Sequence, residues 1–379
     1  MDNKYSYYVT EDYGDSRLLK YWNEAYQNIK DTSFVQKIEW FNAYLKSDLE
    51  ISSYYCFIVF LHNKKPVAVI PLQHHMTNKF GFTLKAWQIL SPNELCLNDL
   101  IFSSAEVNAN IFDHLIEYLN SRQDLPWDLL ELKYCRQGGS VDVAISLKRP
   151  PRSVTIVDNS SKYLLCKSDI DNSIEKQSSK FKRNIRRLWK KLRKKGEITT
   201  HLYKDSSQLD EAFNEFLGVE SSGWKGESMT SLIHDERLQS FYRAILETFG
   251  ENGTCIIHTM KLDGRPIASQ FAVISGETYN MLKIGYDEEF KSEGPGALLI
   301  DETIRLFSND DAINTISFVT GSNWSDKWSP ETLYVANHYI YNRTIKGNTC
   351  YFFEKGKNYL RLLKNNIKQQ RRQYEHTWD

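Results

Sequence analysis

The stretch that decides the fold is KIGYDEEFKSEGPGALLIDETIRLF, residues 283–307 of a chain of 379 residues. Its first residues end an apparent strand, and the loop Gly294-Pro295-Gly296 follows. The apolar residues after the loop have the 3.6-residue spacing of a helix: Ala297, Ile300, Ile304 and Phe307. The segment therefore predicts a strand, a tight loop and a helix, in that order.

This glycine-rich loop has two interpretations, a simple tight turn or an anion site. Glycine leaves the backbone free of side chains, and a helix start presents unpaired N–H groups at the positive end of its dipole. Phosphate or pyrophosphate is the natural ligand of that combination, although the segment is neither a Walker A loop nor a dinucleotide fingerprint. The residues expected to form the anion site are Gly294, Pro295, Gly296, Ala297 and Leu298.

Two distant stretches share one pattern. Residues 56–72 read CFIVFLHNKKPVAVIPL, and residues 255–272 read CIIHTMKLDGRPIASQFA. Both contain an apolar strand, a polar turn and a basic residue followed by proline, an aliphatic residue and alanine. The turn Asp263-Gly264 is a strong hairpin signal. The match of Lys65-Pro66-Val67-Ala68 with Arg265-Pro266-Ile267-Ala268 indicates an internal duplication.

The surroundings of the two hairpins repeat as well. Each follows a helical pattern and precedes a third strand, a helix and a further strand. The order predicts a tandem repeat with partly antiparallel sheets, divided into residues 1–165 and 166–379, rather than a doubly wound parallel fold. Where the second copy has its glycine loop, the first has Ser91-Pro92-Asn93-Glu94-Leu95. We therefore expect the first copy to be a scaffold and the second to carry the site.

Composition narrows the class of protein. The chain is 41% hydrophobic and 25% charged with zero formal net charge, so any basic function must be local. No apolar run approaches the roughly 18–20 residues that span a bilayer, and residues 1–19 have no apolar secretory core. The six cysteines lack CxxC spacing, as in reduced cytoplasmic proteins. We expect a cytoplasmic location.

Residues 176–195 carry eleven Lys and Arg residues and no acid. Four apolar residues fall on one face of the predicted helix: Phe181, Ile185, Leu188 and Leu192. The opposite basic face is a solvated surface, a surface for an anionic ligand, or a contact for nucleic acid or an anionic membrane. These alternatives stay open. The tail, residues 355–372, is expected to be a basic surface helix.

The order of elements resembles the GNAT acyltransferase fold, in which a loop before the central helix holds the donor's pyrophosphate. Residues 170–330 more narrowly resemble the acetyltransferase domain of CelD/BcsL-type proteins, which are similar to the tandem-GNAT FemAB peptidyltransferases. The resemblance implies an α+β fold with tandem GNAT-like domains and mixed, largely antiparallel sheets flanked by helices. It rests on SSKFKRNIRRLWKKLRKKG, GWKGE, DGRPIASQFAV, LKIGYDEEFKSEGPGALL and GSNWSDKW.

This resemblance implies transfer of an acyl group, most simply acetyl, from acyl-CoA to an amine or hydroxyl. The acceptor it suggests is an amino sugar or a polysaccharide or cell-envelope precursor. One alternative is a FemAB-like transferase that takes an amino acid from tRNA. Another is a non-catalytic GNAT-derived binding module. No HExxH, Cys/His cluster or GxSxG motif is present, so we predict no metal and no covalent nucleophile.

The chemistry requires a base for the acceptor's proton and groups that stabilise the leaving thiolate and the oxyanion. Asp287 is the candidate base, Tyr286 the candidate proton donor to the thiolate, and Lys283 the third candidate catalytic residue. Asp287 has a plain alternative as a turn-capping residue. Glu288 and Asp301 are further candidates for the base.

Two short aromatic segments are candidates for substrate binding. Trp224 and Lys225 lie between two glycines, and the alternative for Trp224 is a core anchor. Lys327 and Trp328 close the resemblance. Where the family pattern has a Tyr-Lys pair, this chain has Asp326-Lys327, which puts the role of Lys327 in question.

Overall fold

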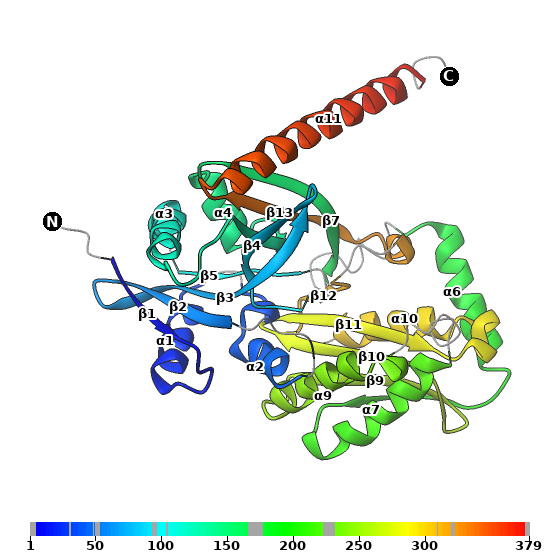
Figure 1. Cartoon of the computed structure of the whole chain (residues 1–379). Coiled ribbons are helices and arrows are strands. Elements are labelled where there is room, and N and C mark those ends of the chain that lie inside the picture. Colours follow the sequence, from blue (N-terminus) through cyan, green and yellow to red (C-terminus); the bar gives the residue numbers. More distant parts are fainter. Residues whose placement is uncertain are drawn as a thin grey trace.

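The computed structural model describes residues 5–29, 32–47, 49, 54–92, 97–103, 105–165, 177–222, 232–308, 310–319 and 323–375. One thirteen-stranded sheet runs through this part of the chain in the order β1-β2-β3-β4-β6-β13-β7-β12-β11-β10-β9-β8, with β5 paired to β3. Helices pack against it in both halves of the molecule (Figure 1).

The first half contains β1 (Tyr5–Thr10), α1 (Ser16–Gln27), η1 (Phe34–Gln36), α2 (Ile38–Lys46), β2 (Tyr54–His62), β3 (Lys65–Lys79), β4 (Phe82–Ile89), β5 (Ile101–Phe102), α3 (Ala105–Ser121), β6 (Leu129–Arg136), α4 (Ser140–Leu147) and β7 (Ser153–Leu165).

The second half contains α6 (Ser179–Leu192), β8 (Ile198–Tyr203), α7 (Ser206–Ser221), η2 (Leu232–His234), α9 (Glu236–Gly250), β9 (Cys255–Leu262), β10 (Arg265–Ser275), β11 (Thr278–Tyr286), η3 (Glu288–Glu293), α10 (Pro295–Ser308), β12 (Thr315–Ser317), η4 (Asn323–Trp328), β13 (Glu331–Tyr341) and α11 (Ile345–Glu375).

The two hairpins repeat residue by residue. Both turns have positive φ at their two central residues, Asn63-Lys64 and Asp263-Gly264, as a type I′ turn requires. Both ladders then contain a register shift after the proline. The pairs are Leu61↔Pro66 and Phe60↔Ala68 in one hairpin, and Lys261↔Pro266 and Met260↔Ala268 in the other.

Each half is a meander followed by a helix and a parallel strand. β4 pairs with β6 in parallel, and β11 pairs with β12 in parallel. The other neighbouring strands, including β5 with β3, run antiparallel. The predicted fold class, a mixed and largely antiparallel sheet flanked by helices, is confirmed.

The C-terminal strand lies in the first half's part of the sheet. β13 pairs with β6 on one side and β7 on the other, and β7 then pairs with β12. Tyr341 and Cys350 share a buried cluster with Leu84 and Leu129. Residues 331–350 therefore pack against strands that precede residue 165. The division at residue 165 remains a prediction.

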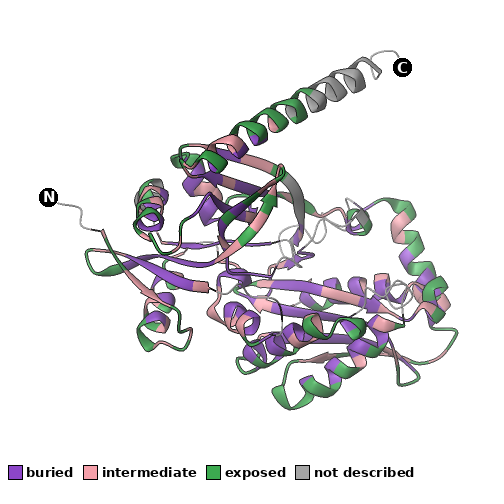
Figure 2. Ribbon diagram, viewed as in Figure 1, coloured by how far each residue is buried: buried purple, intermediate pink, exposed green. Residues whose placement is uncertain are grey.

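A single core joins the two halves near α2 and α9. The rings of Trp40 and Phe241 meet edge to face at 5.2 Å. Phe57 and Phe271, one from each hairpin, belong to the same buried cluster. Figure 2 shows the strands and the facing sides of these helices as buried. The sheet and this core fix the position of the second half's site relative to the first half.

Candidate functional site

A pocket of about 580 Å³ lies in the second half, within the segment that the sequence singled out. It is formed by the start of α6, the end of β11, the first turns of α10 and the η4 segment. Its lining residues are Ser178, Lys180, Phe181, Asn184, Ile284, Tyr286, Gly296, Ala297, Ile300, Trp324, Lys327 and Trp328. This volume is in the range of small-molecule and cofactor sites.

The sheet opens at the pocket. β11 extends to Tyr286 but pairs with β12 only at Thr278, Tyr279 and Asn280. Further along β11, Ile284 and Tyr286 line the pocket. The pocket therefore lies beyond the three residues at which the short strand β12 pairs with β11.

Backbone geometry prepares the loop for a ligand. Gly294 ends η3 with φ of 64°, a conformation that favours glycine. The amide of Leu298 donates to its carbonyl at 3.1 Å, so α10 begins there. Pro295 has no N–H, and by helix geometry the amides of Gly296 and Ala297 have no carbonyl partner within the helix. Two amides are thus available at the pocket wall.

The five residues predicted for the loop take different positions. Gly296 and Ala297 line the pocket. A Cβ on Gly296 would lie 3.2 Å from Cδ1 of Tyr286. Pro295 and Leu298 are buried, and a Cβ on Gly294 would lie 3.0 Å from Cδ1 of Leu188 in α6. The loop is therefore partly ligand surface and partly support.

Glu293 fastens this loop to α6. Its carboxylate is 1% exposed and lies 3.0 Å from Nζ of Lys191 and 3.2 Å from Nζ of Lys195. Ser292 Oγ also donates to it at 2.9 Å. Burial acts to raise the pKa of Glu293, but the hydrogen bonds from Lys191, Ser292 and Lys195 outweigh it and lower the pKa to about 2. Two cations of α6 thus hold the loop.

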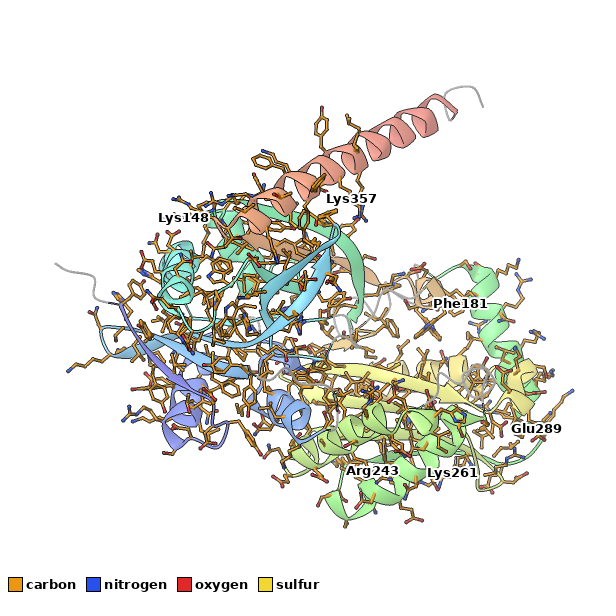
Figure 3. The ribbon with its side chains drawn as sticks, in the orientation of Figure 1. Lys148, Phe181, Arg243, Lys261, Glu289 and Lys357 are labelled. Atoms are coloured by element: carbon orange, nitrogen blue, oxygen red, sulfur yellow. The ribbon has the colours of Figure 1, made fainter. Side chains whose placement is uncertain are left out.

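The predicted amphipathic helix is confirmed in α6. Ile185, Leu188 and Leu192 are buried, and Ser178 caps the helix by accepting a hydrogen bond from the amide of Phe181 at 3.1 Å. This cap directs the first turn toward the pocket. Figure 3 labels Phe181 at this end of the helix.

Among the described residues, the pocket lining contains cations and aromatic rings but no acidic residue. Lys180 comes from α6 and Lys327 from η4. The rings of Phe181 and Trp328 meet edge to face at 4.9 Å. Asp326, which replaces the expected tyrosine, forms an ion pair with Lys162 of β7 and thereby fixes η4. The site suits a ligand with both anionic and flat apolar parts.

Tyr286 is the predicted catalytic residue that faces the pocket. Its hydroxyl donates to Oε1 of Glu288 at 3.1 Å. Burial and, after it, the hydrogen bond to Glu288 raise the pKa of Tyr286 above its ordinary value. The hydroxyl therefore stays protonated at neutral pH, as a proton donor must.

Asp287 lies outside the pocket lining. One of its oxygens is 2.6 Å from Nη2 of Arg265, and the other accepts the amide of Glu289 at 3.0 Å. It is thus the N-terminal cap of η3, the plain alternative raised by the sequence. Asp301 is also engaged, because it accepts from Nε1 of Trp189 at 2.8 Å.

Lys283 faces a different part of the molecule. Its Nζ lies 3.7 Å from Oε1 of Glu220 and 5.6 Å from the centre of the Tyr242 ring. These partners belong to α7 and α9. The register of β10 and β11 shifts beside it, since Phe271 pairs with Lys283 and Ala272 with Met281. The structure therefore does not bring the three predicted catalytic residues together.

The four residues predicted to bind substrate also fall into two groups. Lys327 and Trp328 line the pocket, whereas Trp224 and Lys225 lie outside the described residues. Sequence reasoning did not propose several lining residues. These residues are Lys180, Phe181, Asn184, Ile284, Ile300 and Trp324. The first three lie at the basic start of residues 176–195, and that basic segment was the signal that could have identified them.

Within the described ranges, no three His, Cys, Asp or Glu side chains are grouped to hold a metal ion. No helix there is long and apolar enough to cross a membrane. The described cysteines Cys56, Cys135, Cys255 and Cys350 are free and buried. Burial raises the pKa of the Cys56 thiol to about 12.

Residues 179–327 match the family described as Acetyltransferase (GNAT) domain. This segment contains the loop, α10 and almost all of the pocket lining. The second half of the chain thus contains a GNAT acetyltransferase domain. Comparison of the sequence with curated proteins gave no significant match.

Solved structures share the fold over most of the chain. The crystal structure of FemX has a TM-score of 0.56 at 12% identity and covers 89% of this chain and 98% of its own. The C-terminal domain of a putative lysylphosphatidylglycerol synthetase from Agrobacterium fabrum has a TM-score of 0.52 at 8% identity, covering 88% and 94%. L-PGS from Bacillus licheniformis has a TM-score of 0.51 at 10% identity, covering 91% and 97%. At these identities the likeness shows the fold alone.

Proposed function

We propose that the protein transfers an acyl group, acetyl in the simplest case, from acyl-CoA to an amine or hydroxyl. The observation that carries the proposal is the pocket lined by the end of β11 and by Gly296 and Ala297, whose amides have no carbonyl partner within α10 by helix geometry. The GNAT family match over residues 179–327 supports it.

The lining residues suit the parts of coenzyme A. The amides of Gly296 and Ala297 and the cations Lys180 and Lys327 would bind phosphate oxygens. Ile284 and Ile300 would contact the pantetheine arm. The exposed ring of Trp324 offers a flat surface for the adenine.

Transfer forms a bond between the acceptor's nitrogen or oxygen and the thioester carbon, and it breaks the carbon–sulfur bond. We assign to Tyr286 the proton that neutralises the departing thiolate, because its hydroxyl faces the pocket and its pKa is raised. We assign the acceptor's released proton to solvent, since Arg265 holds Asp287. Positioning of donor and acceptor would supply much of the acceleration.

For the acceptor we propose an amino sugar or a polysaccharide or cell-envelope precursor. The proposal rests on the resemblance of residues 170–330 to CelD/BcsL-type proteins. Trp224 and Lys225 are the proposed acceptor contacts beside Lys327 and Trp328.

Calorimetric titration with free CoA, acetyl-CoA and a long-chain acyl-CoA, at two salt concentrations, tests the donor class. We expect saturable binding that weakens at high salt, because phosphate contacts are screened. The ranking of the three would give the size of the acyl pocket. Absence of binding by all three would refute the proposal. Binding without release of CoA thiol, across a panel of amines and amino sugars, would favour a non-catalytic module.

A second candidate is transfer of an amino acid from tRNA. The observation that favours it is the exposed basic face of α6, which begins at the pocket. Its exposed cations are Lys180, Arg183, Arg186, Arg187, Lys190, Arg193, Lys194 and Lys195, although Lys195 also contacts Glu293. This function predicts tRNA binding with a steep salt dependence and no affinity for free CoA.

A further inference from the structure

The last helix, α11, projects from the body of the molecule (Figure 1). Its first turns are anchored: Glu354 accepts an ion pair from Lys79 at 2.7 Å and a hydrogen bond from the Tyr341 hydroxyl at 3.2 Å. Lys79 Nζ also lies 3.3 Å from the centre of the Tyr339 ring. The base of the helix is therefore held in one orientation on β3 and β13.

One stripe of α11 is apolar and exposed. Ile345, Phe352, Tyr359 and Leu363 follow spacings of seven, seven and four residues along the helix, which place them on one stripe. Figure 2 shows exposed residues along these turns. The exposed fractions are Ile345 87%, Phe352 69%, Tyr359 63%, Leu360 60%, Phe353 55% and Leu363 40%. An ordinary surface helix presents the opposite arrangement, so this stripe is a contact surface.

Cations accompany the stripe. Lys355, Lys357 and Arg361 lie beside it, and Figure 3 shows Lys357 on this helix. Glu354 is already paired with Lys79, which leaves Glu375 as the other acidic residue of the helix. The surface is strongly positive as well as apolar.

A cavity of about 690 Å³ lies between α11 and the start of β7. Its lining includes Arg149, Arg152 and Lys355 with the rings of Tyr351, Phe352 and Tyr359, and the part of the chain that the structure describes contributes no acidic residue to it. Arg149 is fixed by its Nε bond to Ser153 Oγ at 3.2 Å. This positive cavity has room for a phosphate headgroup next to the apolar stripe.

We propose that α11 binds the surface of an anionic phospholipid membrane, with its apolar stripe among the acyl chains and lipid phosphates in the adjoining cavity. An amphipathic helix with aromatic and aliphatic residues on one face and cations beside them binds in this way. The proposal does not depend on the transferase chemistry.

The charge pattern disfavours the two other occupants. A second copy of α11 would place cations against cations. Single-stranded nucleic acid would use the cations and rings, but it gives no partner to the aliphatic side chains of Ile345, Leu360 and Leu363. The phospholipid surface accommodates the cations, the rings and the aliphatic side chains together.

Co-sedimentation of the full-length protein with vesicles tests the proposal. The vesicles are pure phosphatidylcholine, or phosphatidylcholine with roughly 30% phosphatidylglycerol. We expect at least about tenfold stronger binding to the anionic vesicles, weakened by salt. We expect F352S/Y359S/L363S and K355E/K357E each to lose about tenfold or more in binding while keeping the wild-type melting temperature.

Matched control variants alter equally exposed residues elsewhere. L147S/Y334S removes apolar side chains that are 54% and 56% exposed, and K190E/K194E reverses one charge on α6 and one in the turn that follows it. Both should bind anionic vesicles like the wild type. Wild type that ignores anionic vesicles, or α11 variants that bind them normally, would overturn the proposal. So would a loss confined to the α6 control, a dimer abolished by the apolar variant without vesicle binding, or RNA binding in place of vesicle binding.

Discussion

Gly296 is the residue at which backbone and ligand are expected to come closest. It lines the pocket in the first turn of α10, with Tyr286 against the position of its missing Cβ. We predict that Gly296→Asp abolishes CoA binding, because it places a carboxylate where phosphate belongs. An acidic residue is favourable in a first helical turn, so the melting temperature should stay within a few degrees. Calorimetry and thermal denaturation measure the two effects.

Gly296→Ala is the control for size alone, and it should weaken binding less than the aspartate. Retained CoA affinity in the aspartate variant would show that the loop is a turn without an anion site.

The two pocket lysines offer a test of charge. We predict that K180A/K327A weakens CoA binding by about tenfold or more, since each charge-assisted contact contributes roughly 1.5–3 kcal/mol when fully made. K190A, on the same helix but outside the pocket lining, should bind CoA like the wild type. The comparison requires calorimetry at one low salt concentration. Equal effects of all three substitutions would indicate a diffuse basic field instead of a site.

Asp287 shows where residue-level reasoning from sequence reached its limit. The sequence placed it at a strand end beside Tyr286, and this placement is correct. Its neighbour Arg265 is far along the chain and reaches it only because β9, β10 and β11 form a meander. The spacing of residues near Asp287 in the sequence therefore could not predict its contact with Arg265. Tyr286 was easier to place, because its position on β11 directs its ring toward α10.

At the scale of elements, the contact between η3 and α6 should depend on pH. The pKa of Glu293 is lowered from 4.5 to about 2 in the folded protein. Its contribution to stability is therefore present above about pH 4.5 and is lost as the pH falls toward 2. We predict that Glu293→Gln lowers stability by about 2 kcal/mol at pH 7 and by progressively less at lower pH. Denaturant titrations between these limits measure the difference, and a constant difference would contradict the assignment.

The duplicated hairpins provide a matched pair of turn variants. Lys64 has φ of 66° and its counterpart Gly264 has φ of 82°. A left-handed conformation costs a residue other than glycine roughly 1–2 kcal/mol. We predict that Lys64→Gly raises stability by up to about 1 kcal/mol and that Gly264→Ala lowers it by about the same amount. A Cβ on Gly264 would meet nothing within 4 Å, so only backbone strain changes. Equilibrium unfolding should give changes of opposite sign.

Elements with strong local signals were predictable. The turn residues located both hairpins, and the apolar spacing located α6 and α10, because local chemistry determines these features. The residues that line the pocket were harder to predict from the sequence. Ile284 and Ile300 look like ordinary core residues in the sequence. Trp324 belongs to η4, whose contacts are with residues distant in sequence, such as the ion pair of Asp326 with Lys162.

At the scale of the whole molecule, the two copies are not independent. β6 and β7 have β13 between them, and the cluster around Leu84 and Leu129 is completed by Tyr341 and Cys350. We predict that a fragment of residues 1–165 does not fold by itself, because it exposes two strand edges and an open core. Circular dichroism and gel filtration check this. A monomeric fragment with cooperative unfolding would support residue 165 as an autonomous boundary.

Adding residues 331–375 as a separate chain should restore structure to that fragment if the exposed edges are the cause. A chain of residues 166–330 should not. The pairing of β13 with β6 and β7 of the first half could not be predicted from the duplication alone, because the two copies suggested two self-contained sheets. Pairing between residues so distant leaves no periodic signal in the sequence.

The position of β13 also sets an order of events during synthesis. Chains emerge from the ribosome from the N-terminus, and a domain usually folds as soon as it is out. Here the first half cannot complete its sheet until residues Glu331–Tyr341 have been synthesised, because β13 is the strand that lies between β6 and β7. The chain must therefore be translated through Tyr341 before its first half is complete, and a nascent chain stalled in the second half would carry open strand edges that a chaperone must cover.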